Sequence, residues 1–283
     1  MLRSFAIVMS LCLALGFARA EDEVKPIKAL LICGGCCHDY AQQKDILKKG
    51  IEGRAHVTVD VIYSENKSTK PPLAIYGNAD YAKGYDIVIH DECSADVVDP
   101  VVIDAVLKPH REDGIPAVNL HCAMHCYRFG EFHKPVPMGA PNGHWYEYMG
   151  MQSTGHGAQI PIAIKFTDKE SDIVKGLEDW TTIKEELYNN IHVGTCHALA
   201  SGTQISQVKD KEGKVSEKET TTIVVWTNEY TDKKTRVFST TLGHNNQTVS
   251  DPRYIDLVTR GLLWACNKPS ATNLKPVATA PAK

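Results

Sequence analysis

Short apolar segments alternate with amphipathic ones through the first half of the chain. Four apolar runs have the length of buried strands and end in glycine or polar residues, namely residues 27–33, 56–63, 85–90 and 114–120. Two segments between them space their apolar residues as helices do, namely residues 41–53 and 100–108. This alternation predicts an α/β fold of the flavodoxin-like kind, with a mostly parallel sheet flanked by helices.

The second half of the chain has a different pattern. Residues 160–166 are expected to form a strand and residues 172–177 a short helix. Later runs alternate β-branched and polar residues around a charged hairpin at Gly213, namely residues 204–208, 220–227 and 236–241. We therefore expect added antiparallel strands in the C-terminal half. Residues 254–266, after Pro252, are predicted to be a closing helix, and residues 267–283 a disordered tail.

The N-terminus has the pattern of a secretory signal peptide. Arg3 precedes an apolar stretch, and Ala18-Arg19-Ala20 ends it before acidic residues. We predict cleavage after residue 20, a mature domain over residues 21–266, and a periplasmic or secreted location. The apolar stretch is short for a bilayer and no second one follows, so membrane insertion is not expected.

Charge and cysteine content narrow the classes of partner. The net charge of -3 argues against nucleic acid, and it favours a small molecule or a protein; a homo-oligomer stays open. The chain has 9 cysteines, of which Cys12 lies in the predicted signal peptide. In an oxidising compartment the remaining even number favours disulfides over metal ligation by cysteine, although the pairing cannot be deduced.

Histidines follow several predicted strands. His38, His90 and His121 lie at or just after strand ends, and the carboxyl ends of parallel strands form the ligand crevice of open α/β sheets. If the chain turns into a helix after His121, then His121 and His125 share one helical face and could hold one metal ion.

Residues 127–156 are rich in aromatics, glycine and proline, which is typical of a lid or a binding surface. Trp145, Tyr146 and Tyr148 could stack on a sugar ring, or they could pack in a core beneath the loop. Glu185 and Glu186 precede a strand-like pair, so one carboxylate is expected to face the crevice and the other water; a solvated acidic turn is the alternative.

Several of these pieces, taken in order, resemble the ThuA-like (trehalose utilisation) family. They are Gly34 with His38-Asp39, Asn119-Leu-His121, residues 155–161, residues 185–188, Thr240-Thr-Leu-Gly-His244 and residues 252–265. The resemblance covers residues 27–265. It implies a fold similar to class I glutamine amidotransferases and a link to oxidised disaccharides such as keto-trehalose, without a nucleotide cofactor.

The amidotransferase comparison argues against glutaminase chemistry. Aligning the strands places His121 at the nucleophile elbow and His244 near the base. Cys122 falls one residue late and lacks the flanking glycines that a strained elbow needs.

Two kinds of chemistry remain for the histidines. His121, His125 and His244, with Asp39 or Glu186, could ligate a divalent metal, and imidazole ligands favour zinc or a similar borderline ion. Without a metal, His121 and His244 could act as general acid and base, oriented by Asp39 or Glu186. The substrate-binding candidates are His38, His156, Gln159, Trp145, Tyr188 and Asn245.

Two hypotheses follow. The first is a lyase, isomerase or hydrolase that acts on a carbohydrate or a keto-sugar. The second is a noncatalytic protein that uses the same crevice to bind a carbohydrate or a partner.

Overall fold

The computed structural model describes residues 25–194 and 196–275. The predicted signal peptide lies outside the described residues. The strands are β1 (Ile27–Gly35), β2 (Val57–Ser64), β3 (Ile87–Cys93), β4 (Ala117–Leu120), β5 (Met151–Ile160), β6 (Ala163–Phe166), β7 (Trp180–Thr181), β8 (Glu185–His192), β9 (His197–Lys209), β10 (Val215–Tyr230) and β11 (Thr235–Thr240). The α-helices are α1 (Tyr40–Arg54), α2 (Pro100–Lys108), α3 (His144–Met149), α4 (Asn246–Val249), α5 (Pro252–Ala265) and α6 (Ser270–Asn273); the short helices are η1 (Ala74–Gly77), η2 (Pro109–Asp113) and η3 (His121–His125).

One sheet organises the described part of the chain, with its strands in the order β2-β1-β3-β4-β11-β10-β9-β6-β7. The first five strands in this order, β2, β1, β3, β4 and β11, run parallel to one another. The next four, β10, β9, β6 and β7, pair antiparallel with their neighbours. This arrangement confirms the predicted α/β fold, with parallel core strands and antiparallel strands added by the C-terminal half. The last strand, β11, lies in the interior of the sheet between β4 and β10.

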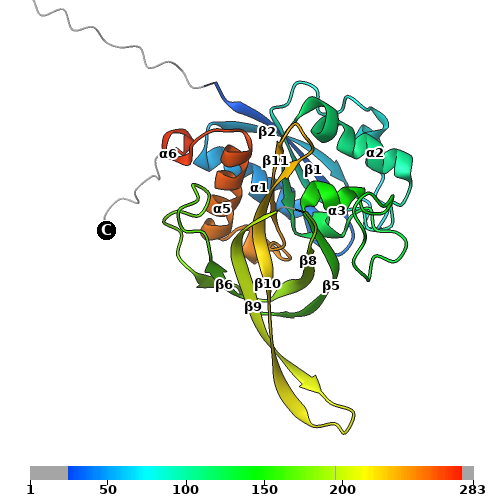
Figure 1. Cartoon of the computed structure of the whole chain (residues 1–283). Coiled ribbons are helices and arrows are strands. Elements are labelled where there is room, and N and C mark those ends of the chain that lie inside the picture. The colour runs from blue at the N-terminus through cyan, green and yellow to red at the C-terminus, as the bar shows by residue number, and fades with distance from the viewer. Residues whose placement is uncertain (1–24, 195, 276–283) are drawn as a thin grey trace, which may run out of the picture.

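Helices cover both faces of the parallel strands, as Figure 1 shows. Helices α1 and α5 pack together on one face, over a core that includes Leu31 and Phe238. Helices α2 and α3 lie on the other face, over a core that includes Ile32, Trp145 and Trp226. Because Leu31 and Ile32 are neighbours that enter opposite cores, β1 is buried on both sides and reads as a continuous apolar run.

The helix starts follow from local sequence. Helix α2 begins at Pro100 and α5 at Pro252, and each proline is preceded by an aspartate whose carboxylate accepts a backbone N–H of the first turn. Proline loses no helical hydrogen bond at that position, and the aspartate satisfies one of the free N–H groups.

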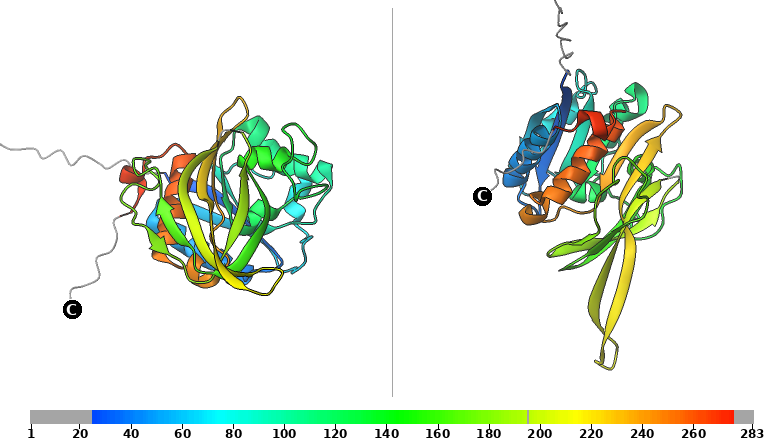
Figure 2. Two further views of the ribbon diagram at one scale, coloured as in Figure 1. Left: turned by 60° about the horizontal axis from the view of Figure 1, so that its bottom comes forward. Right: turned by 90° about the vertical axis from the view of Figure 1, so that its left-hand side faces the viewer.

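The antiparallel part extends away from the body. Strands β9 and β10 form a long hairpin that projects from the sheet in Figures 1 and 2, with its turn near Gly213 as predicted. Strands β5 and β8 form a separate two-stranded sheet. Between residues 25–194 and 196–275, no helix is both long and apolar enough to cross a bilayer.

Three local predictions were wrong. Residues 127–156, expected to be one long loop, contain α3 and the start of β5. Residues 172–177 form turns instead of a helix. The segment after Cys266 is structured as far as residue 275, since α6 lies there and Leu274 bridges to Ala55 beside α1. These short elements depend on contacts with distant residues, which local pattern does not report.

Candidate functional site

Three histidines meet at the carboxyl ends of the parallel strands. His38 follows β1, His121 follows β4 and His244 follows β11, so the sheet order brings together residues that are far apart in the sequence. One ring nitrogen from each lies within 4.8 Å of the other two. We call His38, His121 and His244 the histidine cluster. It lies where ligands bind in open α/β sheets.

Backbone carbonyls orient two of the three rings. Nδ1 of His38 lies 3.0 Å from the carbonyl oxygen of His244, and Nδ1 of His121 lies 2.6 Å from that of Thr241. A carbonyl only accepts, so Nδ1 donates in both rings and Nε2 keeps its lone pair. Metal-binding histidines are commonly held in this way, with the second nitrogen donating to a carbonyl or carboxylate.

His121 occupies a strained turn. Its φ is 41° at the point where β4 passes into η3, and Gly243 approaches it with a φ of 118°. A left-handed backbone is uncommon at residues other than glycine, and such positions gather at functional sites. The turn between β4 and η3 is therefore built around an imidazole.

Glu186 is the carboxylate of the site. Its Oε2 lies 3.6 Å from Nε2 of His121 and 3.4 Å from Nδ1 of His244. Its Oε1 lies 3.6 Å from Nδ1 of His156 and accepts a hydrogen bond from Nε2 of Gln159 at 3.1 Å. Glu186, a predicted site residue, thus contacts four other predicted site residues.

Burial and the glutamate set the protonation of the rings. Burial lowers the pKa of His38 to about 4 and that of His121 well below 6.5. The nearby carboxylate of Glu186 instead raises the pKa of His244. Burial favours the neutral form of Glu186, but its contacts with His244 and His156 outweigh burial and lower its pKa. His38 and His121 are therefore neutral near pH 7, the form that can ligate a metal.

Glu185 has a role that the sequence did not indicate. One of the two carboxylates was expected to face water, but Glu185 is fully buried and Glu186 nearly so. Its Oε2 accepts the backbone N–H of Gly243 at 3.3 Å and that of His244 at 3.1 Å, and Oε1 accepts from Nδ2 of Asn245 at 3.2 Å. Both faces of β8 are covered at this point, so both glutamates are buried. Glu185 holds the backbone of the loop that contains His244, and Glu186 contacts the ring of His244.

The comparisons with known proteins agree with this fold. The family model described as ThuA, trehalose utilisation, matches residues 28–265. The chain belongs to the ThuA family. No curated protein matches it.

Two solved structures are similar to this ThuA chain. One is a ThuA-like protein from Parabacteroides merdae, with 21% identity and a TM-score of 0.56 over 88% of this chain and 97% of that chain. The other is the glutaminase domain of CTPS from Trypanosoma brucei with bound acivicin, with 10% identity and a TM-score of 0.41 over 86% of this chain and 94% of that one. At these identities, the first similarity supports the ThuA fold and nothing further.

His125 lies beside the histidine cluster of the ThuA chain, outside its metal-spaced group. Its Nε2 lies 2.7 Å from Oγ of Ser153, and its ring stacks on Tyr188 at 4.0 Å with parallel planes. The predicted pairing with His121 assumed an α-helix, whereas η3 is a 3₁₀ helix, in which residues four apart point in different directions. His38 takes the third place that the sequence assigned to His125.

Tyr188 contacts both His125 and His121. Its hydroxyl lies 3.3 Å from Nε2 of His121, which accepts because Nδ1 donates to Thr241. The predicted residue Tyr188 is therefore adjacent to the cluster. Ser153, the partner of His125, carried no signal in the sequence.

Trp145 and His90 lie elsewhere. Trp145, predicted to stack on a sugar, is 2% exposed, and its indole N–H donates to the carbonyl of Ala123. Trp145 therefore packs in the core, which was the alternative hypothesis for this residue. His90 is fully buried on the face of β3 that carries α2 and α3, and it contacts Glu92 and His110 instead of the crevice.

A cavity of about 440 Å³ opens beside the cluster and is lined by His38 and His244, among others. This size is typical of small-molecule sites. Asp39 and Asn245 also line it; Asp39 accepts hydrogen bonds from Gln42 and Asn246, and Asn245 caps α4. His121 and Glu186 do not line the cavity and are almost completely buried.

Proposed function

We propose that this ThuA-family protein binds a divalent metal ion, zinc first among the candidates, through His38, His121 and His244, and uses it to act on a carbohydrate or keto-sugar. The observation that carries the proposal is the meeting of three imidazoles whose ring nitrogens lie within 4.8 Å of one another. Ligand nitrogens on one tetrahedral zinc ion are about 3.4 Å apart, so small ring rotations bring these three into range.

The donor set suits such an ion. Three imidazoles favour zinc or a similar borderline cation, and three protein ligands leave a position for substrate or water. The carboxylate of Glu186, 3.4 Å from His244 and 3.6 Å from His121, supplies a compensating negative charge. When bound, a divalent ion would polarise a sugar carbonyl or acidify a bound water.

The chain's own residues would then position the sugar and move its proton. Glu186 is buried, charged and hydrogen-bonded to Gln159, which suits it to hold a proton although it does not line the cavity. His244 contacts that carboxylate and lines the cavity, so without a metal it would pass a proton between Glu186 and a sugar or water in the cavity. Asp39 and Asn245, at the cavity wall, would contact sugar hydroxyls. Lyase, isomerase and hydrolase reactions all need this proton transfer.

The trehalose-utilisation description of the family supports a carbohydrate substrate, and the hydrophobic leader at the N-terminus supports export to the periplasm or the medium.

The first experiment is metal analysis of the untagged protein together with His38→Ala and a matched control, His197→Ala. His197 lies in β9, is paired with Asp168 and is exposed. We expect about one equivalent of metal in the wild type and in His197→Ala, and loss of it in His38→Ala. Equal metal content in all three proteins, or none after incubation with zinc, manganese or iron, would refute the metal site.

The second experiment separates catalysis from binding. Glu186→Gln keeps the shape of the side chain and removes the base. If the protein is an enzyme, this variant still binds metal and sugar, with the metal held less tightly because a negative charge is lost, and its turnover on keto-sugars falls by about 10²-fold or more. Sugar binding without turnover by the wild type, across a panel of sugars and keto-sugars, would instead identify a binding protein.

A further inference from the structure

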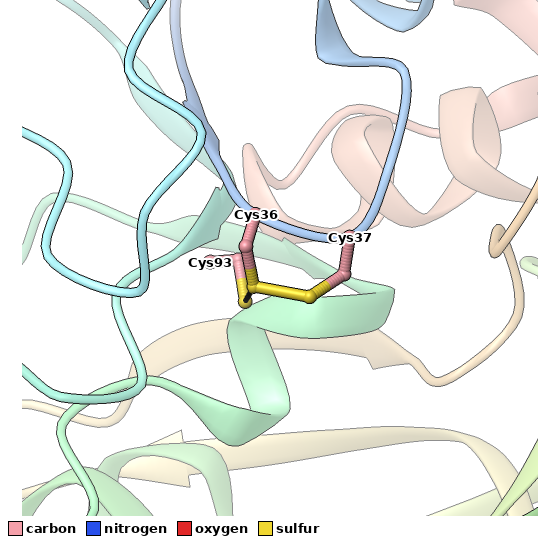
Figure 3. A group of neighbouring side chains, drawn as sticks. All are labelled: Cys36, Cys37 and Cys93. Carbon is pink, nitrogen blue, oxygen red and sulfur yellow. Dashed lines mark hydrogen bonds between the residues drawn. A yellow bond between two sulfur atoms is a disulfide. The ribbon is translucent and has the colours of Figure 1, made fainter.

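A second cluster of reactive side chains lies next to the histidine cluster, and the proposed function does not use it. Cys36 and Cys37, in the loop after β1, form a disulfide between adjacent residues. Sγ of Cys93, at the end of β3, lies 3.6 Å from Sγ of Cys36, and Figure 3 shows the three side chains converging. Sγ of Cys122, in η3, lies 2.7 Å from Sγ of Cys93. A disulfide therefore contacts a thiol, which in turn contacts a second thiol.

The backbone is arranged to bring these sulfur atoms together. Gly35 pairs with Cys93 in the parallel register of β1 and β3, and a Cβ at Gly35 would collide with the carbonyl oxygen of Cys93. Only glycine permits this close approach, which places Cys36 directly beside the end of β3. Cys93 and Cys122 are both buried, whereas Cys37 is exposed.

Cys37 is held in a strained conformation. Its φ is 79°, in the left-handed region that residues other than glycine, asparagine and aspartate rarely adopt. Such a conformation persists only where the surrounding structure enforces it. If the bond between Cys36 and Cys37 opened, Cys37 could leave the left-handed conformation. The strain therefore destabilises this disulfide relative to one between Cys36 and another cysteine.

We propose that Cys36, Cys37, Cys93 and Cys122 form a thiol–disulfide exchange site that passes the disulfide inward and releases the thiol of Cys37 into the ligand cavity. In the step, Cys93 gives up its proton and its sulfur forms a bond to Sγ of Cys36. The Cys36–Cys37 bond breaks, and Cys37 leaves as a thiolate that takes up the proton. One disulfide is present before and after, so no external oxidant or reductant is consumed.

A cysteine side chain must rotate before the exchange can take place. Exchange needs the three sulfurs in line, which would separate those of Cys37 and Cys93 by about 5.6 Å. They lie within 4.8 Å, so a rotation of the Cys36 or Cys93 side chain precedes the reaction. A hydrogen bond from Cys122, followed by the charge of Arg128, lowers the pKa of Cys93 against the opposing effect of burial, which favours its reactive form. Cys122 can then attack Cys93 in the same way and free Cys36.

The consequence concerns the neighbouring site. Cys37 lines the same cavity as His38, the next residue in the chain. As a disulfide it offers no thiol there; after exchange it places a soft, nucleophilic sulfur beside the histidine cluster. This inference does not depend on the metal or on the carbohydrate substrate.

The test is to trap Cys37 in the folded, full-length protein. The protein is incubated with EDTA and iodoacetamide near pH 8 without a reductant, then quenched in acid, digested and analysed by mass spectrometry. We expect alkylated Cys37 together with a peptide pair joined through Cys36 and Cys93, or through Cys93 and Cys122. In Cys93→Ser, alkylation of Cys37 should fall by at least about tenfold. Cys266→Ser, which changes a distant thiol in the last turn of the C-terminal helix region, should behave as the wild type does.

Two results would overturn the proposal. One is a Cys37 that stays unlabelled in the wild type, with the Cys36–Cys37 disulfide intact. The other is labelled Cys37 without either cross-linked pair. If Cys93→Ser does not fold, as judged by circular dichroism, Cys37→Ser provides the test. Oxidised Cys37→Ser must contain a Cys36–Cys93 or a Cys93–Cys122 disulfide, and the absence of both would also refute the exchange.

Discussion

Replacing Gly243 with alanine should weaken both the fold and the histidine cluster. Gly243 precedes His244 and has a φ of 118°, and its N–H donates to the buried carboxylate of Glu185. A Cβ at this position would lie 2.7 Å from the hydroxyl of Tyr254 and 3.5 Å from Cβ of His121. The Tyr254 ring is fully buried, so the hydroxyl has little room to withdraw.

The magnitude has two parts. A left-handed alanine costs about 1–2 kcal/mol, and forcing a methyl group against a packed ring costs about 1–3 kcal/mol more. The expected loss in the free energy of unfolding is therefore about 2–5 kcal/mol. Gly213→Ala is the matched control: its φ is 83° at the hairpin turn, and no atom lies within 4 Å of the added Cβ. It should lose only the first part.

The assay is urea unfolding of the wild type and both variants, followed by zinc titration. Displacing the loop of His244 should also lower zinc affinity by about 10–100-fold in Gly243→Ala and leave it unchanged in Gly213→Ala. Equal destabilisation of the two variants would show that the contact with Tyr254 carries no cost, and the reasoning from close packing would fail.

Three other outcomes are expected. Burial, with the neighbouring His90, lowers the pKa of His110 from 6.5 to about 3, so the unfolded chain binds more protons between these values and stability falls on acidification. Between pH 7 and pH 5 this group should remove about 2 kcal/mol from the free energy of unfolding, a dependence that His110→Gln should lack in urea titrations at both pH values. Gly261→Ala would push a Cβ into the Phe238 ring and should lower the unfolding free energy by about 1–3 kcal/mol, whereas Gly53→Ala, with open space around it, should raise it by up to about 1 kcal/mol. Zinc at about 100 times its Kd should stabilise the wild type by about 2.7 kcal/mol in thermal melts, and EDTA should reverse this; a melting temperature indifferent to both would contradict the metal site.

The parallel core could be predicted because its signals are local. The continuous apolar run of β1 and the proline starts of α2 and α5 are written in adjacent residues, and each reflects burial or capping within one element. The position of His121 at the end of β4 followed from the same pattern, as did that of His38 after β1.

The features that the sequence did not predict depend on which face of a strand or helix a side chain occupies. His90 follows the same apolar pattern as His121, but it enters the core under α2 because β3 continues for three residues beyond it. Glu185 is buried because a loop that arrives from residue 243 onward covers it. The type of helix at η3 decided between His125 and His38, and no residue in that segment distinguishes a 3₁₀ turn from an α-helical one.

The place of β11 in the sheet also governs how the molecule can be assembled. β11 is the last strand in the sequence, yet it pairs on one side with the parallel strand β4 and on the other with the antiparallel strand β10. A nascent or truncated chain that stops before residue 235 would leave the inner edge of β4 unpaired, with its backbone groups open to other chains. Because this pairing joins segments more than a hundred residues apart, folding should be slow, and incomplete chains should aggregate rather than persist as a soluble half.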